Sequence, residues 1–125
     1  MSAYVIAHLR EAVPHTDIAE YIERIAATFE PYGGRTLVHS PRPEVKEGDW
    51  AGQIVMIGFP GTAEARAWWE SPAYREIVPL RQRHSRADVI LLEGVPEGYE
   101  PAVAAQGMRD ALAGRQQPSP ADSPE

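Results

Sequence analysis

The chain has 125 residues, 12 basic against 18 acidic side chains for a formal charge of −6, and no cysteine. This length allows one domain with one hydrophobic core. The negative charge argues against a nucleic-acid or anionic-membrane partner, because both require a basic surface. The absence of cysteine excludes disulfides, thiolate nucleophiles and cysteine-ligated zinc. The sequence contains neither a signal-peptide pattern nor an apolar run of the roughly 20 residues that span a bilayer, so we expect a cytoplasmic protein.

The N-terminal part predicts a strand, a helix and a second strand. Residues 3–10 alternate with neither face fully polar, which indicates a strand. Thr16 or Asp17 is expected to cap a helix, since their side-chain oxygens accept from free backbone amides. The glycine pair at 33–34 is expected to supply positive φ angles before a short strand over 35–40. The apolar stripe of the helix consists of Ile18, Tyr21, Ile22, Ile25 and Phe29.

A charged loop over 41–52 leads into the second half of the pattern. Residues 53–59 form a strand that is apolar on both faces. Thr62 is expected to cap the next helix, whose buried side carries Ala65, Trp68 and Trp69.

Ser71 and Pro72 mark the start of a further helix, because serine caps and proline at the first position loses no needed donor. Pro79 lacks a backbone N–H and is expected to kink or split this helix. Residues 88–94 then predict a last strand, again without polar alternation.

The predicted order β-α-β-β-α-β is that of a ferredoxin-like α+β fold, a four-stranded antiparallel sheet with helices on one face. The other face would be polar in a monomer, yet strands 53–59 and 88–94 are apolar on both faces. A second copy of the chain is the economical cover, and we predict a homodimer. We predict this domain over 1–96, a C-terminal extension with a weak helical pattern over 97–114, and a disordered, proline- and serine-rich tail over 115–125.

A series of short motifs lies between about Tyr4 and Val95: Tyr32-Gly33-Gly34, Glu47-Gly48-Asp49-Trp50, Phe59-Pro60, Ala67-Trp68, Ser71-Pro72-Ala73-Tyr74, Leu80-Arg81 and Glu93-Gly94. In this order and spacing they resemble the domain-of-unknown-function family 1330, within the dimeric α+β barrel superfamily. The resemblance implies a ferredoxin-like protomer whose sheet pairs face to face with that of a second protomer.

The resemblance implies no single activity, because the superfamily includes cofactor-free monooxygenases, isomerases, polyketide cyclases and haem-degrading enzymes, and fold does not fix function. His39, Trp69 and the extension after residue 99 depart from the family pattern. A site common to the family should therefore not depend on these three features.

Arg81 is the sharpest candidate for a binding residue. It lies on the apolar helical stripe of Tyr74, Ile77 and Val78, where an unpaired charge is costly. One interpretation is an anchor for a ligand carboxylate or enolate. The other is a structural ion pair with Asp88, Glu93 or a carboxylate of a second protomer.

Three aromatic residues are further candidates for ligand binding. Tyr74 and Trp68 lie near Arg81 on adjacent helical turns, where they line a pocket or pack in the core. Trp50 follows an acidic turn, where it closes a pocket mouth or packs on a partner subunit. The sequence leaves both pairs of alternatives open.

His39 and His8 lie on predicted strands and are the candidate catalytic bases, since a neutral imidazole can accept a proton near pH 7. His15 is interpreted as a loop residue, and His84 as a residue near a helix end. No two histidines have the local spacing of a metal site, and the sequence has no dinucleotide or phosphate-binding motif, so we predict neither a metal nor a cofactor.

Three functions remain open. The first is a small-molecule-binding protein, in one form a cofactor-independent enzyme acting on an aromatic or polyketide-like substrate. In it, Arg81 and Tyr74 orient an oxyanion while His39 or His8 moves a proton. The second is a binding or accessory module without catalysis, and the third is a haem-handling protein, suggested by superfamily kinship alone.

Overall fold

The computed structural model describes residues 2–116, which fall into two compact units with a boundary between Val95 and Pro96. The elements are β1 (Ala3–Ala12), α1 (Thr16–Phe29), a 3-10 turn (Glu30–Tyr32), β2 (Arg35–His39), β3 (Gln53–Phe59), α2 (Thr62–Glu70), α3 (Pro72–Gln82), β4 (Ser85–Glu93) and α4 (Pro101–Gln116).

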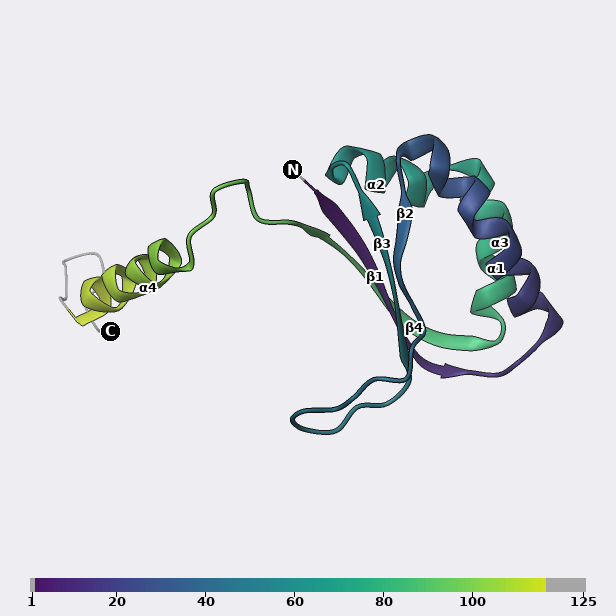
Figure 1. Ribbon diagram of the computed structural model, residues 1–125, viewed down its shortest axis with the longest axis horizontal. Coiled ribbons are helices and arrows are strands. Elements are labelled where there is room, and N and C mark those ends of the chain that lie inside the picture. The colour runs from purple at the N-terminus through teal and green to yellow at the C-terminus, as the bar shows by residue number, and fades with distance from the viewer. Residues whose placement is uncertain (1, 117–125) are drawn as a thin grey trace, which may run out of the picture. The chain divides into compact units, whose positions relative to one another are not determined.

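The first unit is a four-stranded sheet with the order β2-β3-β1-β4, in which all neighbours are antiparallel. Helices α1, α2 and α3 lie on one face of this sheet (Figure 1). Together these features confirm the predicted ferredoxin-like α+β fold.

Strand pairing fixes which side chains share a face of the sheet. Val5 lies opposite Ile57, and both are buried in the core beneath the helices, which defines the inner face. The next residue, Ile6, lies opposite Met56 and Ile90 on the outer face, since successive strand residues point to opposite sides. The outer face carries Tyr4, Ile6, His8, Leu37, Val38, Ile54, Met56, Ile90 and Leu92.

The core of the first unit is centred on Trp68 of α2, which is only 1% exposed. Its ring lies 4.2 Å from that of Tyr74 and 5.4 Å from that of Phe59, measured between centroids. Its indole Nε1–H donates to Thr28 Oγ1 at 2.9 Å, which satisfies the one polar group of the ring. Trp68 therefore joins α2 to α1, α3 and the sheet.

Two predicted helix caps are wrong. The N-cap of α1 is His15, whose Nδ1 accepts from the backbone N–H of Asp17 at 2.9 Å, while Thr16 is already helical. The carboxylate of Asp17 faces His84 instead of the helix amides. The N-cap of α2 is Gly61, without a side-chain cap, because Thr62 is the first helical residue. The predicted cap at Ser71 is confirmed, since its Oγ accepts from the backbone N–H of the third residue after it.

The glycine pair at 33–34 acts differently from the prediction. Gly33 has a φ of 75°, as expected, but Gly34 does not have a positive φ. A Cβ at Gly34 would lie 2.8 Å from side-chain atoms of both Phe29 and Phe59, so this glycine permits close approach of the aromatic core.

Helix α3 and strand β4 also differ from what the sequence pattern suggests. Helix α3 runs through Pro79 without being split. Strand β4 begins at Ser85 rather than at residue 88, because β1 continues to Ala12 after an irregularity between Leu9 and Glu11 and pairs with these extra residues.

The second unit contains α4, which has its apolar side chains exposed, among them Val103, Met108 and Leu112. The helix ends at Gln116, so the predicted disordered tail lies, from residue 117 onward, outside the described residues. Among the helices of residues 2–116, none has the length and apolar character needed to cross a bilayer.

Candidate functional site

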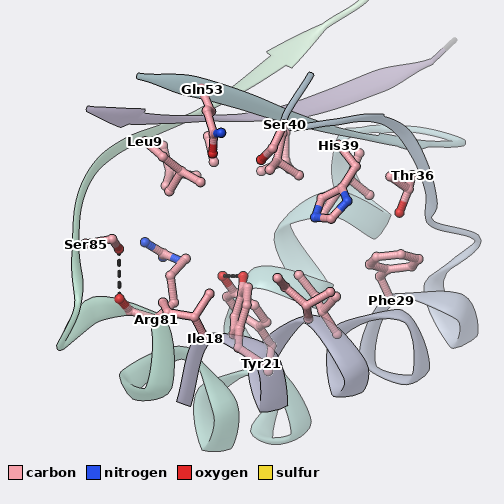
Figure 2. Close-up of a pocket in the computed structure, with 18 of the residues that line it drawn as sticks. Leu9, Ile18, Tyr21, Phe29, Thr36, His39, Ser40, Gln53, Arg81 and Ser85 are labelled. Atoms are coloured by element: carbon pink, nitrogen blue, oxygen red, sulfur yellow. Dashed lines mark hydrogen bonds between the residues drawn. The ribbon is translucent and has the colours of Figure 1, made fainter. Parts of the chain in front are cut away.

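A cavity of about 220 Å³ lies between the inner face of the sheet and helices α1 and α3 (Figure 2). Aliphatic and aromatic side chains make up most of its wall, including Val5, Leu9, Ile18, Ile25, Phe29 and Val89. Besides the hydroxyl groups of Tyr21 and Tyr74, polar side chains are few: Thr36, His39, Ser40, Gln53, Arg81 and Ser85. An apolar chamber with a few convergent polar groups is the usual form of a small-molecule site.

Arg81 is the charged group in the wall of this cavity. The residue is only 7% exposed, and its side chain points into the space between the sheet and the helices (Figure 2). Its Cζ lies 5.7 Å from the ring centroid of Tyr21, a cation–π contact. Among residues 2–116, no carboxylate oxygen lies within 4.0 Å of the guanidinium. Asp88, one of its expected structural partners, pairs instead with Arg10, at 2.6 Å between Oδ2 and Nε.

Two tyrosines of the cavity wall form a hydrogen-bonded pair beside Arg81. The hydroxyl oxygens of Tyr21 and Tyr74 lie 2.9 Å apart. One hydroxyl donates to the other, so the accepting hydroxyl keeps its own proton to donate elsewhere. Tyr74 is itself buried, and its hydroxyl is satisfied by this side chain rather than by the backbone.

The electrostatics of this group keep the arginine charged and the tyrosine neutral. Burial lowers the pKa of Arg81, but the nearby phenols of Tyr74 and Tyr21 outweigh it and raise the pKa above its ordinary value. Burial, reinforced by Tyr74, raises the pKa of Tyr21 well above its usual range. At neutral pH the site therefore presents a guanidinium beside the neutral phenol of Tyr21. The guanidinium and the one free hydroxyl proton of the tyrosine pair can donate to an anionic oxygen.

The predicted site residues divide between the two faces of the sheet. Arg81, Tyr74 and Trp68 line the cavity, and so does His39, which is exposed at the cavity rim at the end of β2. Figure 2 shows the His39 ring projecting from the sheet side toward the chamber.

His8 and Trp50 do not line the cavity. Their rings stack at a centroid distance of 4.4 Å and an interplanar angle of 21° on the outer face. His8 Nε2 also lies 2.6 Å from the backbone oxygen of Ala51, so this pair fastens the long loop to the sheet.

His15, Asp17 and His84 form a second polar cluster, where the β1–α1 loop meets the turn before β4. Candidate ligand atoms of these three residues lie within 4.8 Å of one another. The two imidazoles stack at 3.8 Å and 14°, and His84 Nε2 lies 2.9 Å from Asp17 Oδ2. A metal ion lies in the plane of each imidazole that binds it, and two nearly parallel planes this far apart cannot both contain it. The cluster fits a structural hydrogen-bonded corner better than a metal site.

The comparison with family models decides the classification. The model described as "Domain of unknown function (DUF1330)" matches residues 2–95. The chain belongs to the DUF1330 family. No curated protein sequence shows a significant match to the chain.

Solved structures share the fold of this DUF1330 protein at low sequence identity. A protein of unknown function from Rhodopseudomonas palustris is 17% identical, with a TM-score of 0.58 over 76% of this chain and 83% of that one. A dimeric ferredoxin-like protein of unknown function from Jannaschia sp. is 14% identical, with a TM-score of 0.54 over 75% and 100%. SnoaB, a cofactor-independent oxygenase from Streptomyces nogalater, is 12% identical, with a TM-score of 0.56 over 79% and 98%. These likenesses show the fold alone.

One residue that matters for the chemistry of the cavity was not predicted as a site residue. Tyr21 was counted only as part of the apolar stripe of α1, although its hydroxyl faces Tyr74 and its ring faces Arg81. The signal was present: a residue with a polar tip among isoleucines on a buried stripe requires a polar partner on the opposing helix. The residue that provides this partner depends on how α1 packs on α3.

Proposed function

We propose that this DUF1330 protein binds a small, mainly apolar molecule that carries an anionic oxygen, such as an aromatic carboxylate or the enolate of a polyketide-like compound. The observation that carries the proposal is Arg81, a buried guanidinium that faces an apolar chamber and has no carboxylate partner among residues 2–116.

A buried charge without a counter-ion is expensive, so an arginine at such a position needs an energetic or functional reason. The hydroxyl groups of Tyr21 and Tyr74 provide dipoles, and the raised pKa of Tyr21 keeps its phenol neutral at neutral pH. A bound carboxylate or enolate would provide the charge, with the free phenol proton as an additional donor. Unmatched charge in a concave, apolar site is typical of ligand recognition.

The size of the chamber limits the ligand. An apolar cavity of about 150 Å³ accepts benzene. The cavity here measures about 220 Å³, so one aromatic ring with a short side chain or a compact bicyclic system would fit. The body of the ligand would contact the isoleucine and valine side chains, and its oxyanion would contact Arg81.

In the enzymatic form of the proposal, Arg81 and the tyrosine pair stabilise negative charge that develops on a substrate oxygen during proton removal. His39 is the titratable residue of the rim that would accept the proton, whereas His8 lies on the outer face. SnoaB, which shares the fold, is a cofactor-independent oxygenase, so this fold is compatible with chemistry that needs no cofactor.

The binding-module alternative uses the same anion site without a proton-transfer step. It differs from the enzymatic form only in the role of His39, which would then be a rim residue. For the haem-handling alternative, the cavity wall offers His39, a histidine exposed at the rim, and no observation on residues 2–116 favours it over the anion site.

We also propose that the protein is a homodimer in which two outer faces pack together. No element of the first unit covers this face, and Ile90 and Leu92 are 49% and 44% exposed there. Monomeric proteins rarely leave large contiguous apolar patches uncovered. The structural neighbour from Jannaschia sp. is described as dimeric, and the protomer fold is the same.

Titration calorimetry with benzoate, 3-phenylpropionate and 2-naphthoate tests the anion site. We expect at least one of them to bind the parent, to bind Arg81→Met about 10–100-fold more weakly, and to bind Arg42→Gln as the parent does. The second variant removes an exposed loop arginine and controls for net charge. Failure of all three acids to bind, or equal binding to Arg81→Met, would overturn the proposal.

A chromophoric phenol separates the oxyanion site from simple apolar binding. The Arg81 guanidinium should lower the pKa of bound 4-nitrophenol, so its phenolate absorbance would appear at lower pH with the parent than in free solution. With Arg81→Met the bound phenol should lose this shift. His39→Gln should leave the shift intact, because His39 is proposed to move a proton rather than to hold the oxyanion.

A further inference from the structure

The cavity is adjacent to a second, open space at the β4 edge of the sheet. This space, which we call the basic vestibule, measures about 740 Å³. Its polar lining consists of Arg10, Arg81, Gln82, Ser85, Arg86 and Asp88. Four residues line both the vestibule and the cavity, namely Trp69, Arg81, Ser85 and Val89. Arg81 therefore stands in the wall between an apolar chamber and a polar, solvent-accessible space.

The charge of the vestibule is opposite in sign to that of the whole chain. Three arginines and one aspartate line it, whereas the chain has a formal charge of −6. Asp88 is paired with Arg10, and no carboxylate oxygen lies within 4.0 Å of Arg86 among residues 2–116. The vestibule is thus lined by Arg86, which lies opposite Glu11 in the strand pairing, and by Arg81, and neither guanidinium has an ion pair within 4.0 Å among residues 2–116.

We propose that the ligand is a bipartite anion: an apolar ring in the cavity, a first carboxylate or enolate at Arg81, and a second anionic group in the basic vestibule at Arg86. This inference rests on the proposed anion site and adds to it the class of substrate, an aromatic compound with two neighbouring acidic groups. Arg86 is then a specificity-determining residue, which selects dianions over monoanions.

The position of Arg81 at the shared wall is what favours a dianion over a monoanion. An acid that fills only the cavity would neutralise the charge of Arg81 and would make no contact with Arg86. A second acidic group on the same side chain would extend from Arg81 into the vestibule, where it meets a cation and the exposed amide of Gln82. Because Arg86 is exposed, its contribution should be modest and should decrease with salt.

Two matched probes test the inference on the full chain: 3-phenylpropionate and 2-benzylsuccinate, which share the phenyl ring and differ by one carboxymethyl group. At low ionic strength, calorimetry should show the dianion binding about three- to tenfold more tightly than the monoanion. Arg86→Gln should remove this preference, because it should weaken the binding of 2-benzylsuccinate more than that of 3-phenylpropionate. Arg42→Gln, an exposed arginine outside the vestibule, should keep the preference.

The outcomes separate this inference from the proposed function. Equal binding of both probes by the parent, or an equal loss of preference in Arg42→Gln and Arg86→Gln, overturns the bipartite ligand while the anion site at Arg81 stands. If neither probe binds, or if Arg81→Met binds both as the parent does, the anion site fails and the inference fails with it.

Discussion

The two faces of the sheet have similar apolar side chains and opposite environments. The inner face is covered by α1, α2 and α3 and encloses both the Trp68 core and the cavity. The outer face is covered by none of these three helices, and the long loop lies against it through Trp50. Two pairs of like residues are divided between these faces: Trp68 and His39 belong to the inner side, whereas Trp50 and His8 stack together on the outer side.

This difference shows that residue type alone does not assign a role in this protein. Trp68 is 1% exposed and packs in the core, whereas Trp50 is 44% exposed and holds the long loop against the sheet by stacking on His8. Substitutions on the inner face should change folding stability or ligand binding, and those on the outer face should change association.

The largest effect is expected from the two tryptophans. Trp68→Ala should lower the free energy of unfolding by about 3–5 kcal/mol, because it leaves a cavity among Phe29, Phe59 and Tyr74. Trp50→Ala should cost less than about 1 kcal/mol, as is usual for exposed positions. Urea denaturation measures both. If Trp68→Ala does not fold, Trp68→Phe retains a ring and should still cost more than Trp50→Ala; equal losses would contradict the inner–outer distinction.

A charge on the outer face should separate the protomers. Ile90→Asp would bury one unpaired carboxylate from each copy in the proposed interface and should raise the dimer dissociation constant by at least about a hundredfold. Ala67→Asp places the same charge on the exposed side of α2 and should have no effect. Sedimentation velocity at micromolar concentration provides the readout, and a parent protein that sediments as a 13.8 kDa monomer would remove the basis of the dimer.

In the cavity on the inner side of the sheet, Arg81→Met should change the free energy of unfolding by less than about 1 kcal/mol or should increase it. Replacing a buried charge by an apolar side chain of similar length is often neutral or stabilising when no ion pair is broken. Thermal and urea denaturation without ligand would measure this. A loss of about 3–5 kcal/mol would indicate a structural ion pair with a carboxylate of a second protomer.

The smallest effect concerns the corner where α1 meets the turn before β4. The hydrogen bond from His84, together with the charges of His15 and Arg83, holds the pKa of Asp17 below its ordinary value of 3.8. Because the folded pKa is the lower one, this carboxylate stabilises the fold above about pH 4, and its contribution disappears as the pH falls through the folded pKa.

Asp17→Asn should therefore lower the melting temperature slightly at neutral pH, and the difference from the parent should shrink between about pH 5 and pH 2. Asp49→Asn, in the exposed loop, should show no such trend. Differential scanning calorimetry across this range measures the difference, and a gap that stays constant with pH would contradict a role for the ionised carboxylate.

The sequence predicted the order of elements because each rests on local chemistry. Three signals depend only on residues close together in the sequence: the isoleucine stripe of α1, the Ser71 cap of α3 and the apolar run of β3. At α1, a tertiary contact outweighed the local preference for capping. Asp17 bonds to His84, which is 67 residues away, and is no longer available to cap its own helix.

The candidate site was predictable only in part. The position of Arg81 on a buried stripe was visible in the sequence, since helical spacing fixes which residues share a side. The absence of a nearby carboxylate among residues 2–116 was not, because it depends on Asp88 pointing to the outer face and pairing with Arg10. The tyrosine pair likewise depends on the packing of α1 against α3.

The sequence by itself determined the βαββαβ framework, the family and the two-sided apolar strands, because these follow from period, caps and motif spacing. Only the tertiary structure decided which of the two strand faces is the inner one. Alternation places neighbouring strand residues on opposite sides, but the side that receives the helices is set by long-range packing. That choice places His39 at the cavity and His8 outside it, and it leaves Arg81 in the wall of an apolar cavity.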